Sequence, residues 1–252
     1  MDFAQSLKSA FEAHAAAQIQ IRGPISPAEH EPIIWSLQNR KTYPRLPKIK
    51  FLGQEAAGSG TTDAALADVL RQRASCRDFS NRPLKFEALG YLLASTAMAR
   101  AGAMVGIRPY PSAGARYPLE VYVGAGNVEP IPNGLYHYDA VEHHLTVLET
   151  SDALAAASRL TGTSIVNADV VIYLTGALHR TCVKYGGRGY RYALIEAGAL
   201  AQNICLMAAG LGLGSFLIGG FDDELVCDYL DVSPELELEY PLVIIIIGAT
   251  TA

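Results

Sequence analysis

The sequence predicts an α+β protein in which helices flank a central mixed or antiparallel sheet. Two short runs of β-branched residues, at 170–175 (VVIYLT) and 242–247 (LVIIII), are typical of strands that are covered on both faces. Between them lies a long apolar segment at 190–211, which has the length of a helix and glycines near its C-terminal end. Strands and helices mixed in this way, without an internal repeat, indicate one sheet covered by helices.

The chain divides into an N-terminal arm, 1–60, and a single domain, 61–252. The arm combines a short helix at 3–19 with proline-containing segments and a Gly/Ser/Thr stretch. This composition favours an appended segment over a second compact domain. We expect this arm to complete a dimer or to dock a partner.

The first elements of the domain follow from periodicity. The first helix, 62–75, places three apolar residues on one face and has a Thr-Asp pair available as its N-cap. These residues are Leu66, Val69 and Leu70 on the face and Thr62 or Asp63 at the cap. A second helix is predicted at 86–99, a strand at 118–123, and a hairpin of strands 135–138 and 145–148.

Charge and composition exclude some classes of partner. The chain has 25 Asp and Glu against 20 Lys and Arg, whereas nucleic acids and anionic membranes reward clustered cations. The long apolar segment contains Glu196, Gln202 and Asn203, so we expect a buried helix rather than a membrane span. The N-terminus lacks the apolar stretch of a signal peptide, the cysteines are widely spaced and the histidines show no ligand spacing. We therefore expect a cytoplasmic protein with reduced thiols and no metal site.

Arg73, Ser75 and Arg77 form a first candidate binding element, in RASCRDF. Alternate residues of an extended segment point the same way, so two guanidinium groups and a hydroxyl could grip a phosphate together. The residues alone favour the alternative, a solvated basic helix end that is stabilised by the helix dipole.

Two glycine-containing turns could allow a flat ligand to approach the backbone. Pro111, Ser112 and Gly114 belong to the turn PSAG, and Gly219 and Gly220 follow a predicted strand in LIGGFDDE. Neither turn matches a phosphate loop or a dinucleotide fingerprint, and each is weak by itself. Asp222 or Asp223 can cap a helix that follows the second turn.

The segment KYGGRGYR at 184–191 is the densest constellation of reactive groups. Adjacent Lys184 and Tyr185 form a sensible acid/base pair, because a nearby ammonium stabilises a phenolate. A flexible cationic loop is an equally good interpretation of these residues alone.

Glu196 and Asn203 are seven residues apart on the predicted long helix and therefore lie on one face. A buried carboxylate is costly unless it is paired, and Arg188 or Arg191 is the nearest obvious partner. We hypothesise that Glu196 anchors the segment before the helix, a structural role that is favoured over a catalytic carboxylate.

In this order, the segments resemble the nitroreductase superfamily and, within it, the SagB-type dehydrogenases, which include oxidases of thiazole/oxazole-modified peptide pathways. The resemblance covers about residues 41–248 and depends on the ordered set of blocks. These blocks are KTYPRLPKI, RxSxR at Arg73, Ser75 and Arg77, RPYPSAGARYPLEVYV, GLYHYD, KYGGRGYR, EAGALAQN and GGFDD.

The resemblance implies a nitroreductase-like fold built as an intertwined homodimer, with FMN at the interface. It assigns Arg73, Ser75 and Arg77 to the flavin phosphate and ribityl side. It places Pro111, Ser112, Gly114, Gly219 and Gly220 around the flavin ring. Lys184 and Tyr185 match a Lys-Tyr pair that acts as base in azoline oxidation. Ala199 departs from the pattern, because the family often has histidine after EAG.

The expected activity is therefore base-assisted oxidation of a thiazoline or oxazoline, on a peptide or carrier-bound intermediate, to the azole. Two alternatives stay open. One is an NAD(P)H-dependent nitro or enone reductase, because a shared fold does not fix the substrate. The other is a flavin-binding scaffold subunit of a biosynthetic complex, docked through the arm.

Overall fold

The computed structural model describes residues 9, 12, 40–51, 64–100 and 106–251. Of the helix predicted at 3–19, only Ser9 and Glu12 are described, and both are helical. The Gly/Ser/Thr stretch of the arm lies outside the described residues. A described part of the arm does join the domain, because β1 pairs with β6 at the edge of the sheet.

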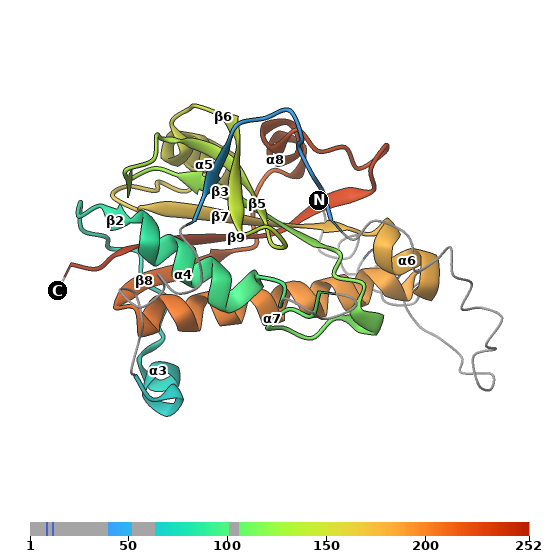
Figure 1. Ribbon diagram of the computed structural model, residues 1–252, viewed down its shortest axis with the longest axis horizontal. Helices are drawn as coiled ribbons and strands as arrows, with labels where there is room; N and C mark the ends of the chain where they lie inside the picture. The colour runs from blue at the N-terminus through green and yellow to red at the C-terminus, as the bar shows by residue number, and fades with distance from the viewer. Residues whose placement is uncertain (1–8, 10–11, 13–39, 52–63, 101–105, 252) are drawn as a thin grey trace.

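A seven-stranded sheet organises the domain, in the order β1-β6-β5-β3-β7-β9-β8 (Figure 1). Every neighbouring pair in this sheet is antiparallel. The strands are β1 (Lys48–Lys50), β3 (Leu119–Ala125), β5 (Gly134–Asp139), β6 (His144–Glu149), β7 (Val170–Ala177), β8 (Leu213–Ile218) and β9 (Glu239–Ala249). A separate parallel pair joins β2 (Leu84–Lys85) to β4 (Val128–Glu129).

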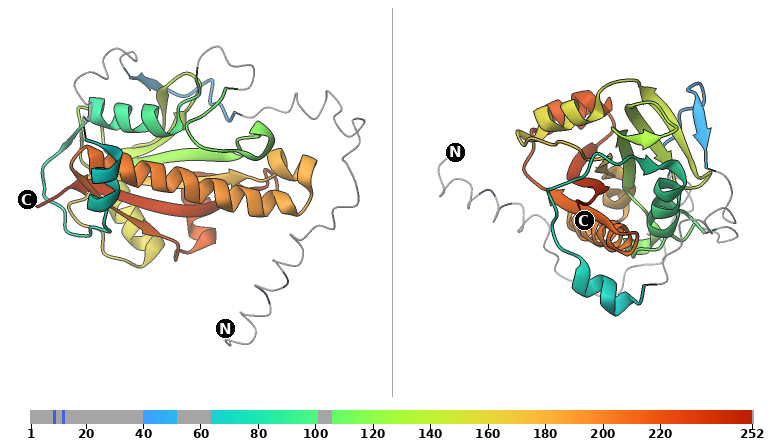
Figure 2. Two further views of the ribbon diagram at one scale, coloured as in Figure 1. Left: turned by 90° about the horizontal axis from the view of Figure 1, so that it is seen from below. Right: turned by 90° about the vertical axis from the view of Figure 1, so that its left-hand side faces the viewer.

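Helices cover both faces of the sheet (Figure 2). Among the described residues they are α3 (Leu66–Gln72), α4 (Phe86–Ala97), α5 (Ala153–Thr161), α6 (His179–Tyr185), α7 (Arg188–Gly210) and α8 (Asp223–Leu230), with a short 3-10 turn η3 (Ala113–Ala115). The long α7 packs with α4 over one face, whereas α5 and α8 contribute to the core of the other. The predicted α+β class, with helices flanking a central sheet, is confirmed.

The central strands explain why their sequences read as continuous apolar runs. In β7, Ile172 and Leu174 pack in the core under α4 and α7. Val171 and Tyr173 point to the other side, into the core with α5 and α8. Because successive side chains of a strand alternate between faces, a sheet covered twice requires apolar residues at every position.

The first predicted helix differs from its expected form. It begins at Leu66 with Ala65 at the N-cap and no side-chain cap, so the predicted caps are wrong. Of the expected apolar face only Val69 is buried, while Leu66 is 66% and Leu70 52% exposed. Among the described residues, Leu66 and Leu70 of this helix are not buried against the apolar partner that its pattern predicts. The cap predicted for the last helix is confirmed, because Asp222 accepts the Leu225 N–H at the start of α8.

Within the described part of the chain, α7 is the helix whose length and composition would allow it to cross a bilayer. In its most apolar window, 44% is buried inside the protein. Core helices pass the same test, so α7 gives only weak support for a membrane span.

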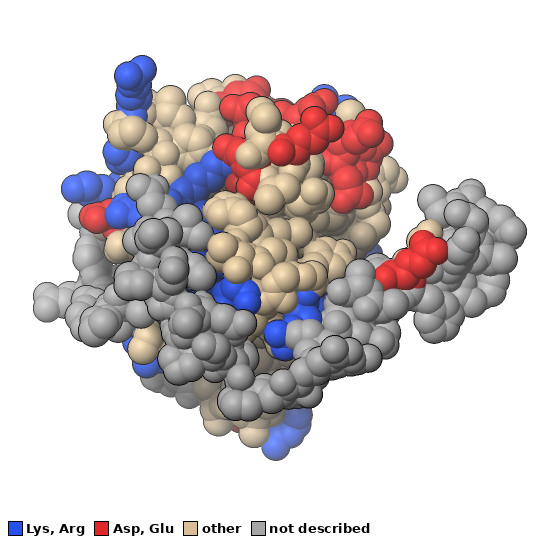
Figure 3. Space-filling model, turned by 90° about the vertical axis from the view of Figure 1, so that its right-hand side faces the viewer, with Lys and Arg blue, Asp and Glu red and all other residues tan. Residues whose placement is uncertain are grey.

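The net charge is unevenly distributed along the chain. Residues 192–252 contain nine Asp and Glu and no Lys, Arg or His. Figure 3 shows acidic side chains gathered on one face of the molecule. The predicted cationic elements, around 73–77 and 184–191, both lie outside this acidic stretch.

Candidate active site

The structure brings the PSAG turn and the Lys-Tyr pair together. Gly114 lies in η3 with φ of 61°, outside the helical range. A Cβ atom at Gly114 would lie 2.5 Å from Tyr185 Oη and 3.1 Å from Lys184 Nζ. Two segments about 70 residues apart in sequence, each weak alone, therefore meet at one place.

The local sequence fixes this geometry on both sides. Ser112 Oγ accepts the Tyr117 N–H at 2.8 Å and closes the turn around Gly114. On the other side, α6 ends at Tyr185, followed by Gly186 with φ of 56°. Lys184 thus lies in the last turn of α6, where the helix dipole favours a cation.

Cationic and aromatic groups surround the Tyr185 ring. Lys184 Nζ lies 5.3 Å and Arg188 Cζ 5.9 Å from the centre of this ring. Tyr192 meets the same ring edge-on, with centroids 5.1 Å apart. Lys184, Arg188 and Tyr192 therefore pack around the Tyr185 ring, whose hydroxyl lies against Gly114.

Glu196 has a different partner from the one expected. The Ser112 hydroxyl hydrogen-bonds to the Glu196 carboxylate, and the positive charge of Arg108 stabilises that carboxylate electrostatically. The hypothesis that Arg188 or Arg191 pairs with Glu196 is therefore wrong, because the helix turns this side chain toward the PSAG turn. Glu196 is 2% exposed, and its Oε1 accepts no hydrogen bond from the described residues. Burial raises its pKa to about 7, although Ser112 and Arg108 oppose the shift.

Asn203 supports the same segment two turns further along α7. Its Nδ2 donates to the Pro109 carbonyl at 3.1 Å. The polar pair on one face of α7 therefore holds residues 109–112 at two points, one through Pro109 and one through Ser112. The expected shared face is confirmed, but it anchors the PSAG turn rather than the segment that precedes the helix.

We expect Glu196→Gln to change how stability depends on pH. A carboxyl with a raised folded pKa contributes stability below its unfolded pKa, and this contribution is lost as pH rises through about 7. The free energy of unfolding of the wild type should therefore fall between pH 5 and 8, relative to the variant, by at most about 3 kcal/mol. Urea unfolding of both proteins at four pH values measures this difference.

The matched control for this prediction is Glu87→Gln, which neutralises an exposed glutamate in the first turn of α4. Asp169, whose pKa burial raises to about 6, titrates in all three proteins and cancels in the comparison. Parallel stability curves for the wild type and Glu196→Gln would contradict the prediction.

Arg73, Ser75 and Arg77 lie along the edge of β8. Ser75 forms a parallel bridge with Ser215, and the Cys76 N–H donates to the Ser215 carbonyl at 2.9 Å. The segment is therefore extended, as expected, and Ser75 and Arg77 are exposed while Cys76 is partly buried. Arg77 lies over the ring of Phe216, with its Cζ atom 5.0 Å from the centroid.

Gly219 and Gly220 follow β8 directly. A Cβ atom built on either glycine would have no neighbour within 4 Å, so open space surrounds both. Strand β8 thus runs from Ser215, which lies beside the cationic segment at 73–77, to Gly219 and Gly220.

The second group and the Gly114 turn lie against different parts of α7. The charge of Arg73 opposes the burial that raises the pKa of Cys205 in α7. Ser112 hydrogen-bonds to Glu196, which lies nine residues nearer the start of the same helix. That separation is about 14 Å along the helix axis. Figure 1 accordingly shows α3, which precedes Arg73, near one end of α7 and α6 at the other. One chain therefore holds the predicted site residues in two places.

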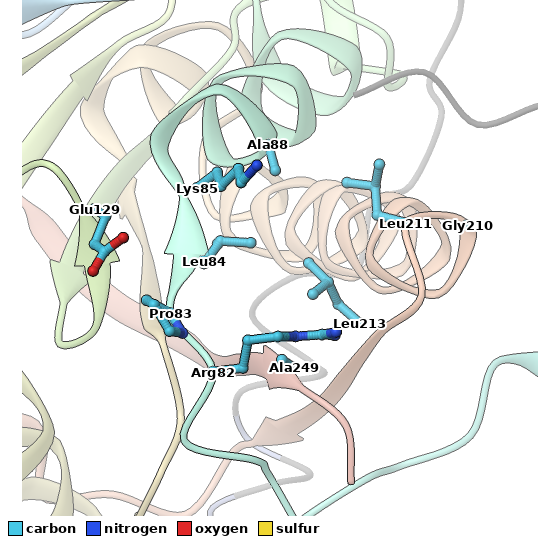
Figure 4. A pocket seen from close by; sticks show the side chains of 10 residues that line it. All are labelled: Arg82, Pro83, Leu84, Lys85, Ala88, Glu129, Gly210, Leu211, Leu213 and Ala249. Atoms are coloured by element: carbon cyan, nitrogen blue, oxygen red, sulfur yellow. The ribbon is translucent and has the colours of Figure 1, made fainter. Parts of the chain in front are cut away.

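Two further pockets were not predicted from the sequence. One, of about 570 Å³, opens beside the C-terminal end of α7 (Figure 4). It is lined by Arg82, Pro83, Leu84, Lys85, Ala88, Glu129, Gly210, Leu211, Leu213 and Ala249. The other, of about 580 Å³, includes Lys41, Arg180 and Glu239 among its lining residues. No predicted site residue lines either pocket.

The fold, a central sheet flanked by helices, is that of the nitroreductase class of proteins. The Nitroreductase family model matches residues 70–249, and the chain belongs to this family. The protein MJ1384 of Methanocaldococcus jannaschii, which carries a nitroreductase name, is 36% identical over 188 residues, covering 73% of this chain and 90% of its own.

Two further similarities concern microcin synthesis in Escherichia coli. The microcin B17-processing protein McbC is 30% identical over 132 residues, which are 50% of this chain and 48% of McbC. The solved McbBCD microcin synthetase complex, bound to truncated pro-MccB17, matches with a TM-score of 0.64 at 20% identity, over 100% of this chain and 95% of that chain. The resemblance to the nitroreductase superfamily is confirmed, and the McbC match agrees with the SagB-type group within it.

Proposed function

We propose that this chain is an FMN-dependent dehydrogenase that oxidises an azoline ring, on a peptide or carrier-bound intermediate, to the azole. The observation that carries the proposal is the contact of Lys184 and Tyr185 with the Gly114 turn. This contact presents an ammonium and a phenol together at a glycine whose missing side chain lets both groups approach the turn.

We call the Gly114 turn with Lys184 and Tyr185 the first half-site, and 73–77 with Gly219 and Gly220 the second half-site. The hydrogen-bond donors of the second half-site suit FMN. Arg73, Ser75 and Arg77 supply two guanidinium groups and a hydroxyl from one extended segment, which suits a phosphate. The open space at Gly219 and Gly220 leaves room for a ring. We propose that these residues hold FMN, with the ring lined by Pro111, Ser112 and Gly114. When bound, FMN would supply the two-electron redox chemistry.

We also propose a homodimer, because one chain keeps its two half-sites apart. Pairing of two chains would bring the cationic segment of one chain to the Gly114 turn of its partner. Exposed apolar side chains near both half-sites support such an interface. They are Leu66, Leu70, Tyr190, Leu194, Ile195 and Leu217.

In the proposed reaction the azoline loses two hydrogens. Lys184 and Tyr185 would take one as a proton from the ring carbon, and bound FMN would supply the two-electron acceptor for the other, which leaves as hydride. Glu196 and Asn203 hold the turn that faces the reacting pair. Dioxygen is the final electron acceptor that we propose.

A second candidate function is favoured by the similarity to MJ1384 and its nitroreductase name. An NAD(P)H-dependent nitro or enone reductase would use the same cofactor elements. Rapid anaerobic bleaching of the bound flavin by NADPH would favour this reductase. Oxidation of an azoline peptide without added nicotinamide would favour the dehydrogenase.

A biosynthetic complex is a further part of the proposal. McbC is similar to this chain in sequence, and the matching McbBCD structure is a complex with truncated pro-MccB17 bound. By analogy, the arm at 1–60 would dock a partner enzyme in the cytoplasm, and the substrate would be a peptide. The alternative of a purely scaffolding subunit predicts that variants of Lys184 and Tyr185 leave the pathway output intact.

We expect purified protein to carry stoichiometric FMN, and Ser75→Ala/Arg77→Gln to lose most of it. Losing two charge-assisted hydrogen bonds, each worth about 1.5–3 kcal/mol, should weaken FMN binding by at least about 100-fold. The visible spectrum, followed by heat release and chromatography of the chromophore, measures the flavin content, and titration of the apoprotein gives the affinity.

Arg71→Gln is the matched control, because it removes a guanidinium two residues before the cationic segment. Arg71 is exposed and pairs with Asp68 within α3. It should leave FMN content unchanged. A colourless wild type that cannot be reconstituted with FMN would rule out the proposed cofactor.

A further inference from the structure

The seven-residue helix α6 carries the reacting pair but buries no apolar side chain of its own. Its buried residues are Arg180 and Thr181, and Val183 is 47% exposed. A helix of this length is unstable unless tertiary contacts hold it. The position of Lys184 and Tyr185 therefore depends on the tertiary contacts of α6, among which the polar contacts of Arg180 are buried.

Arg180 makes three of these contacts, all with residues 116–120, which follow the Gly114 turn and enter β3. Its Nη2 donates to Glu120 Oε1 at 2.5 Å and its Nη1 to the Tyr117 carbonyl at 3.3 Å. Its own carbonyl accepts from Arg116 Nε at 2.7 Å. The same stretch of chain, 112–120, thus carries the turn and holds the helix that faces it.

Glu120 is fixed from further directions. His137 Nε2 lies 2.8 Å from its Oε2, and the Lys41 backbone N–H donates to its Oε1 at 3.1 Å. Burial would raise the pKa of Glu120, but Arg180 and His137 outweigh it and hold the pKa well below its usual range. The carboxylate therefore remains charged and paired at neutral pH.

We propose that Arg180, paired with Glu120, is a positioning residue that holds α6 so that Lys184 and Tyr185 face the Gly114 turn. The proposal rests on the proposed function for the roles of Lys184 and Tyr185. Its structural part does not, since it concerns the placement of α6 alone. A lysine at position 180 keeps the charge but cannot donate to Glu120 and Tyr117 in the same planar arrangement.

Cys182 gives a reporter for the placement of α6. A Cβ atom at Gly189 would lie 2.7 Å from both Cys182 N and Sγ, so the thiol packs against the start of α7. Burial raises the pKa of this thiol, which slows its alkylation. Cys205 and Cys227 are free and buried elsewhere, so they report opening of the whole domain.

The test is alkylation of the purified full chain by iodoacetamide, with the rate at each cysteine followed by peptide mass mapping. In Arg180→Lys, Cys182 should react at least about tenfold faster, while Cys205 and Cys227 keep their wild-type rates. Arg71→Lys is the matched control, because it alters another arginine–carboxylate pair, with Asp68 within α3. It should leave the Cys182 rate unchanged.

Steady-state oxidation of an azoline peptide tests the link to the reaction. Arg180→Lys should lower kcat about tenfold or more with KM nearly unchanged, because the reacting groups are displaced while the binding surface remains. Equal acceleration at all three cysteines, or none, would overturn the proposal. So would a normal kcat in a variant with selectively faster Cys182 labelling.

Labelling needs no substrate, so it decides the placement of α6 even if the chain oxidises no azoline. Should Arg180→Lys fail to fold, hydrogen exchange of the wild type replaces it. The Cys182 and Gly186 amides bond to Leu178 and Cys182 carbonyls within α6. They should be protected as well as amides of α7, and exchange about 100-fold faster than α7 would overturn the proposal.

Discussion

Replacing Lys184 by alanine and Tyr185 by phenylalanine together is expected to slow azoline oxidation by about 10²–10⁴-fold and to leave FMN content unchanged. The double change removes both groups that lie against Gly114, which we propose take the ring proton. It leaves the cationic segment at 73–77 untouched. Initial rates with an azoline peptide, normalised to flavin absorbance, measure the effect.

Val183→Ala provides the comparison, since Val183 lies on the same short helix but is exposed. It should retain the wild-type rate. If the double variant binds FMN and oxidises the peptide normally, Lys184 and Tyr185 are not the base. If it loses FMN as well, the two half-sites depend on each other more closely than the proposal states.

The sheet and the long helix could be predicted because their patterns are dictated by burial. Both faces of β7 and β9 are covered, so 170–174 and 241–249 are apolar without interruption. Nothing comparable marks α6, whose sequence HRTCVKY has no apolar periodicity and buries Arg180 and Thr181. A helix held by polar contacts with a distant strand leaves no periodic pattern of its own.

Contacts between residues far apart in the chain are a second feature that the sequence does not predict. The sequence predicts that Glu196 pairs with the nearest cations along the chain, Arg188 and Arg191, whereas it binds Ser112, which is far away in sequence. Composition identified a buried carboxylate that needs a partner, but only the fold selects that partner. The grouping of Gly114 with Lys184 was likewise implied by the family resemblance and not by spacing.

The exposed face of α3 shows a third limit, of a different kind. The pattern at Leu66 and Leu70 correctly marks an apolar surface, yet both side chains are exposed in one chain. An apolar pattern predicts that a surface is covered and does not say which chain covers it. The proposed homodimer would supply the missing cover.

Gly114→Ala is expected to reduce the rate of azoline oxidation by about 10- to 100-fold with only a small loss of stability. The new Cβ would lie 2.5 Å from Tyr185 Oη, so the phenol must move. Tyr185 Oη and Lys184 Nζ are the ends of flexible side chains, so moving them costs little folding energy. A displacement of about 1 Å at a reacting group can nevertheless cost about 100-fold in rate.

Gly162→Ala separates the backbone cost of this change from its effect on the site. Gly162 caps α5 with φ of 61°, the same value as Gly114, and a Cβ there would meet nothing within 4 Å. Both variants should lose about 1 kcal/mol of unfolding free energy in urea, because alanine is disfavoured at positive φ. Only Gly114→Ala should lose activity. Equal activities in the two variants would mean that Tyr185 acts from another position, or not at all.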